Sequence, residues 1–109
     1  MTNQPPKKTR RQALEEIVAA QPADAFARYG LALDFMNAGE GAAADGHFRK
    51  LIELNPAYVP AYLMYAQLLI RESRSEDARQ ILQSGIAAAI AAGNSHARSE
   101  LEGLLAELP

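Results

Sequence analysis

The sequence predicts an all-α protein built as a stack of antiparallel helical hairpins. About a fifth of its 109 residues are alanine, the strongest helix former, and β-branched residues are few. Apolar residues recur at three- and four-residue spacing between prolines and glycines, which is the period of amphipathic helices. The links between the expected helices are short, and short links make consecutive helices run antiparallel.

About six helices are expected, over residues 9–20, 24–37, 41–54, 59–71, 75–92 and 94–108. The first opens with Thr9 and Gln12, which fit a capping box in which each side chain satisfies the other's backbone N–H group. The second ends at Gly39, a residue that tolerates a left-handed cap, and Pro56 closes the third. Each of the first three helices therefore has its own start or stop signal.

The last three helices carry comparable signals. The fourth has Pro60 in its first turn, where a missing N–H group costs nothing. The fifth is expected to use Ser75 as its N-cap, with the favourable acid Glu76 in its first turn and Gly93 after its end. The sixth presents an apolar side made of Ala97, Leu101, Leu104, Leu105 and Leu108.

The second and third helices can be laid over the fourth and fifth as an internal repeat. The first pair has the order Phe26-x-x-Tyr29-Gly30-x-x-Leu33, then Ala44-x-x-x-Phe48 and Pro56. The second has Tyr62-x-x-Tyr65-Ala66-x-x-Leu69, then Ala78-x-x-x-Leu82. Placing Phe26 on Tyr62 gives a period of 36 residues, with two extra residues expected around 37–41. We expect these aromatic residues in the core, and small residues (Gly30, Ala66) where two helices approach closely.

This order resembles the tetratricopeptide repeat (TPR) family, whose pattern is Trp-x-x-Leu-Gly-x-x-Tyr, then Ala-x-x-x-Phe, then Pro. Aromatic Phe26 and Tyr62 stand in place of the Trp, and four residues match outright: Gly30, Ala44, Phe48 and Pro56. The second repeat lacks the closing proline. The resemblance covers residues 9–108 and implies a right-handed superhelical stack in a single domain over 9–109. Its parts are a half repeat (9–21), two repeats (23–56 and 59–93) and a capping helix (94–108).

Composition and motifs give no support to catalysis. The chain has no cysteine, and neither His47 nor His96 has a second ligand at zinc spacing, so we expect no metal, no cofactor and no catalytic residue. A net charge of −2 and the lack of a long apolar segment argue against nucleic-acid or membrane partners and favour a cytoplasmic protein. Residues 1–8 are expected to form a flexible basic tail, either simply solvated or in weak contact with phosphate or an acidic partner.

The resemblance implies a protein-interaction module that binds a polypeptide segment in a concave groove lined by the first helix of each pair. Carried over by alignment, the groove residues are Arg28, Leu31, Asp34 and Phe35, with Leu63, Met64, Gln67, Ile70 and Arg71. Arg28 and Arg71 are expected to bind a carboxylate of the partner. The family's clamp for chaperone tails is not matched. The alternative is a self-associating subunit of a larger complex, such as a homodimer.

Overall fold

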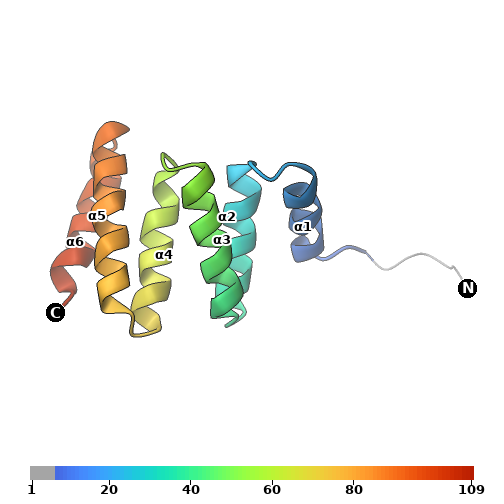
Figure 1. The fold of residues 1–109 in the computed structure, drawn as a ribbon, viewed down its shortest axis with the longest axis horizontal. Coiled ribbons are helices and arrows are strands. Elements are labelled where there is room, and N and C mark those ends of the chain that lie inside the picture. The colour runs from blue at the N-terminus through green and yellow to red at the C-terminus, as the bar shows by residue number, and fades with distance from the viewer. Residues whose placement is uncertain (1–6) are drawn as a thin grey trace, which may run out of the picture.

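Six helices follow one another in chain order along the long axis of the molecule, from α1 at one end to α6 at the other, as Figure 1 shows for this computed structural model, which describes residues 7–109. Most of the expected tail, residues 1–6, therefore lies outside the described residues. The helices are α1 (Arg10–Ala20), α2 (Ala25–Asn37), α3 (Gly41–Leu54), α4 (Val59–Arg71), α5 (Ser75–Ala91) and α6 (Ser95–Glu107). No strand occurs in the described part of the chain, so the expected all-α fold is confirmed.

Side chains cap three of the helices at their first turn. The Gln12 backbone N–H donates to Thr9 Oγ1 (3.1 Å) and the Thr9 N–H donates to Gln12 Oε1 (3.0 Å), which confirms the expected capping box. Asp24 caps α2 and Asn94 caps α6 by single hydrogen bonds, which their side chains accept from the backbone N–H groups of Ala27 and Ala97. The expected Ser75 cap is wrong by one residue, because Ser75 is already helical and α5 begins without a side-chain cap.

The two hairpins repeat at 34 residues, not at 36. Helix α2 begins at Ala25 and α4 at Val59, while α3 begins at Gly41 and α5 at Ser75, so both offsets are 34 residues. The two extra residues expected around 37–41 are therefore absent. The corrected register places α2 residues opposite α4 residues as follows: Arg28 with Tyr62, Leu31 with Tyr65, and Ala32 with Ala66.

Burial of the side chains supports this register. Phe26, expected in the core, is 77% exposed, whereas Tyr62 is buried. Ala32, and not Gly30, is the small residue of the first hairpin, because Ala32 is fully buried in the same cluster as Ala44. Gly30 instead faces α1, where an added Cβ would lie 3.4 Å from a Leu14 methyl group.

The core consists of two clusters that meet at α4. One joins α2, α3, α4 and α5 around Phe48, Leu51, Leu68 and Leu69. The other joins α4, α5 and α6 around Tyr62, Leu82 and Leu101. At Gly85 an added Cβ would lie 2.6 Å from the Tyr62 Cβ, so glycine is required for α5 to approach α4 this closely. None of the described helices has the length and hydropathy that crossing a membrane requires.

Candidate functional site

Residues of α2, α4 and α6 line a hollow of about 220 Å³ on one side of the stack. Its apolar lining comes mainly from Tyr29 of α2 and from Pro60, Leu63 and Met64 of α4. A second hollow of about 310 Å³ continues between α4 and α6 and shares Leu63 and Glu100 with the first. Because the two hollows share these residues, they form one elongated depression.

We call this depression the α4–α6 groove. Ten residues define it: Tyr29, Pro60, Leu63, Met64, Gln67, His96, Glu100, Gly103, Leu104 and Glu107. Gly103 contributes open space, because an added Cβ there would meet no atom within 4 Å. His96 and Glu100 form the surface pair expected from their spacing, with 3.2 Å between His96 Nε2 and Glu100 Oε1.

The structure places three of the predicted site residues in the groove lining: Leu63, Met64 and Gln67. These three residues lie on α4. The two extra residues that we expected around 37–41 belong to the first repeat, so they did not affect the alignment of α4 with the family pattern. Leu63 and Met64 are partly exposed, and Gln67 is exposed.

The predicted groove position is wrong for Leu31 and Arg28, because both side chains are buried. Leu31 is 1% exposed and Arg28 is 9% exposed. The Arg28 guanidinium lies between α2 and α3, donating to the Pro22 carbonyl (3.1 Å) and lying 3.4 Å from His47 Nδ1, while its Nε finds no partner among residues 7–109. Burial, followed by the Arg28 charge, lowers the pKa of His47. Arg28 therefore cannot grip the carboxylate of a partner.

Asp34 and Phe35, also predicted to line the groove, instead face α1. The Arg11 side chain forms an ion pair with Asp34 (2.7 Å), and its guanidinium lies 4.0 Å from the centre of the Phe35 ring. The Phe35 ring also stacks on the His47 ring, with their centroids 5.4 Å apart. Asp34 and Phe35 hold α1 against the first hairpin, and they are not among the residues that line the α4–α6 groove.

The last two predicted residues lie at the C-terminal end of α4. Ile70 is half-buried and packs against the first core cluster, so it belongs to the core boundary. Arg71 is exposed, but its guanidinium donates to the Met36 carbonyl (3.2 Å) and so ties α4 to the end of α2. The Met36 carbonyl also accepts from the Gly39 backbone N–H (3.1 Å), so Arg71 adds a second hydrogen bond at the C-terminus of α2.

Sequence reasoning missed the groove residues of α2 and α6. With the 34-residue period, Tyr29 corresponds to Leu63, and the prolines Pro22 and Pro56 already carry that spacing in the sequence. Glu100, Gly103 and Glu107 were overlooked because α6 was expected to act only as a cap.

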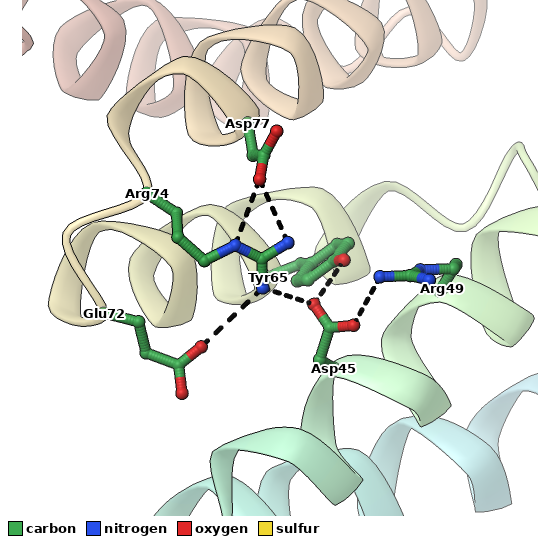
Figure 2. A network of polar contacts seen from close by, with 6 residues as sticks. All are labelled: Asp45, Arg49, Tyr65, Glu72, Arg74 and Asp77. Carbon is green, nitrogen blue, oxygen red and sulfur yellow. Dashed lines mark hydrogen bonds and ion pairs between the residues drawn. The ribbon is translucent and has the colours of Figure 1, made fainter.

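A polar network lies away from the groove and joins α3, α4 and α5 (Figure 2). Asp45 Oδ1 accepts from the Tyr65 hydroxyl (2.6 Å) and from Arg74 (3.1 Å), and Asp45 Oδ2 accepts from Arg49 (2.7 Å). Burial, followed by the hydrogen bond to Asp45, raises the pKa of Tyr65. The charges of this network offset one another, which suits a clamp between repeats. Among residues 7–109, no three His, Cys, Asp or Glu side chains gather as a metal site.

Comparison with known proteins agrees with the helical arrangement. The tetratricopeptide repeat family model matches residues 35–108. The chain belongs to the tetratricopeptide repeat family. A TPR repeat-containing protein of Pseudomonas aeruginosa is 26% identical over 97 residues, which cover 89% of this chain and 92% of that protein.

Two solved structures share the fold of this TPR chain. The solution structure of a tetratricopeptide repeat domain protein from Salinibacter ruber is 31% identical, with a TM-score of 0.76, over 80% of this chain and 88% of that one. A protein from Bordetella parapertussis is 25% identical, also with a TM-score of 0.76, over 91% of this chain and 86% of that one. Tetratricopeptide repeats are in general protein–protein interaction modules, stacked so that one flank is open to a partner.

Proposed function

We propose that this TPR protein binds a segment of another polypeptide in the α4–α6 groove and catalyses no reaction. The observation that carries the proposal is the apolar lining that three helices supply together, with Tyr29 from α2, Leu63 and Met64 from α4, and Leu104 from α6. A concave apolar surface with a few polar groups at its edge is the usual form of a binding site.

The corrected period extends this surface onto α2. Position for position, Phe26 corresponds to Pro60, Tyr29 to Leu63, and Leu33 to Gln67. Phe26 is 77% exposed at the start of α2, and an aromatic side chain left in water is a favourable contact for a partner. A bound segment that runs from α6 across α4 would therefore reach Phe26.

A partner suited to this surface presents two or three aliphatic or aromatic anchors in an extended or helical segment. Its affinity would come from desolvating Leu63 and Met64 and from filling the open space beside Gly103.

The test uses peptides selected for binding to the whole chain from a random twelve-residue display library. We expect the Gly103→Leu variant to bind the selected peptides at least about tenfold more weakly, a change that corresponds to about 1.4 kcal/mol. The new side chain meets no existing atom at its Cβ, so it projects into the second hollow and displaces the peptide without disturbing α6.

Gly46→Leu is the matched control. Gly46 is also an exposed glycine inside a helix with no atom within 4 Å of an added Cβ, but it stands on α3, away from the groove. The control should bind the peptides as the parent does. Peptides that bind both variants equally, or a library from which no binder emerges, would contradict the proposed function.

A further inference from the structure

The α6 side of the groove is acidic. The second hollow is lined by two carboxylates, Glu100 and Glu107, and none of its lining residues described in the structure is basic. The two acids are seven residues apart, which places them on the same face of α6, about 10.5 Å apart along its axis. Gly103 lies between them and leaves the space open.

Neither carboxylate is neutralised by a buried or firmly held cation. Glu107 forms no ion pair with any residue in the range 7–109, and it stands at the C-terminal end of α6, where the helix dipole adds further negative potential. Glu100 is paired with His96, whose side chain is 88% exposed. An exposed pair of this kind exchanges readily for a new partner.

The arginines that come near this region are already engaged. Arg71 donates to the Met36 carbonyl on the α2 side of α4. Arg79, which extends from α5 to the end of α6, donates to the Pro109 carbonyl and lies 3.6 Å from Glu76. The two glutamates therefore face the position of a bound segment with the exposed His96 as their one partner among the described lining residues, and no lysine or arginine lines either hollow.

We infer that the partner segment carries lysine or arginine next to its apolar anchors, an inference that rests on the proposed function. An apolar side chain would occupy the hollow beside Leu63 and Met64, and basic side chains would reach Glu100 and Glu107. In an extended segment of polyproline II geometry, which has three residues per turn and rises about 3.1 Å per residue, side chains three residues apart share one face about 9.3 Å apart and approximately match the separation of the two acids. This charge preference is the reverse of the carboxylate recognition that the sequence predicted for Arg28 and Arg71.

The experiment reads the composition of the selected peptides and then removes the two charges. Selected peptides are expected to be enriched in Lys and Arg near their apolar residues and depleted of Asp and Glu. The double variant Glu100→Gln with Glu107→Gln should weaken their binding roughly fivefold or more at low salt and flatten its salt dependence. It leaves the apolar lining intact, so binding through the anchors persists.

A second double variant, Glu53→Gln with Glu76→Gln, changes the net charge equally at exposed sites on α3 and α5 and should leave binding unchanged. Thermal unfolding of both variants, followed by circular dichroism, checks that they fold.

Three outcomes would overturn this inference. In the first, the selected peptides show no preference for Lys or Arg but bind Gly103→Leu more weakly than the parent chain, and the proposed function then stands. Indifference to Gly103→Leu would overturn both. A dimer in sedimentation that Gly103→Leu abolishes would assign the groove to a second copy and also overturn the inference.

Discussion

At the residue scale, Asp45 shows how one carboxylate connects the two repeats. It is buried on α3 and receives hydrogen bonds from Tyr65 on α4 and from Arg74, the residue before α5. Buried carboxylates persist only where such donors compensate the loss of water.

The capping box at Thr9 was predictable because its partners are three residues apart. The Asp45 network was not, since Tyr65 and Arg74 are 20 and 29 residues away, and periodicity says nothing about such pairs.

Tyr65→Phe should lower the free energy of unfolding by about 1 kcal/mol, because it removes the hydroxyl donor to Asp45. The ring remains stacked on Phe48, so the packing contribution is kept. Urea denaturation measures the change. Tyr58→Phe is the control, since the Tyr58 hydroxyl has no hydrogen bond to any described residue, and it should be nearly neutral. An equal loss in both variants would show that the bond to Asp45 contributes little.

At the element scale, helix positions were predictable and the register of α2 was not. Capping residues, prolines and glycines mark where each helix begins and ends, and all six lie within about two residues of expectation. Helix α2 has large apolar residues on several sides, including Phe26, Leu31 and Phe35, so its pattern does not define which side is buried. Phe26 was mistaken for the large residue of the motif, although Arg28 occupies that place. Because of that two-residue error, two of the predicted groove residues of α2, Arg28 and Leu31, fall on buried positions, and the other two, Asp34 and Phe35, fall on positions that contact α1.

The links after α2 and α4 each place one residue in the left-handed backbone conformation. Gly39 has φ 77° after α2, and the corresponding residue after α4 is Ser73, with φ 61°. A side chain in this left-handed conformation is strained, and glycine relieves the strain. Ser73→Gly should therefore raise the free energy of unfolding by about 0.5–1 kcal/mol.

The matched control for this prediction is Ser84→Gly, the same chemical change inside α5. There glycine should lower stability by about 0.5 kcal/mol, because it is a poorer helix former than serine. Chemical denaturation of the two variants should give changes of opposite sign. A loss of stability in both would mean that the backbone at Ser73 is not strained.

At the scale of the whole molecule, the groove is a product of stacking. Tyr29, Leu63 and Glu100 stand on three different helices, and only the superposition of hairpins brings them to one surface. The repeat pattern in the sequence predicted the stack of hairpins. The acidic side of the groove was not predicted, because it depends on how α6 packs against α4. The repeat pattern therefore predicts that such a surface exists, and the position of α6 in the stack determines its charge.

The most direct test of this account is a nuclear magnetic resonance titration of the labelled chain with a selected peptide. The amide signals that shift most should belong to groove residues of α2, α4 and α6, including Tyr29, Leu63, Met64 and Gly103. Signals of the polar network, such as those of Asp45 and Arg49, should stay in place. Shifts confined to α1, α3 and α5, with the groove signals unmoved, would contradict the claim that this protein binds its partner between α4 and α6.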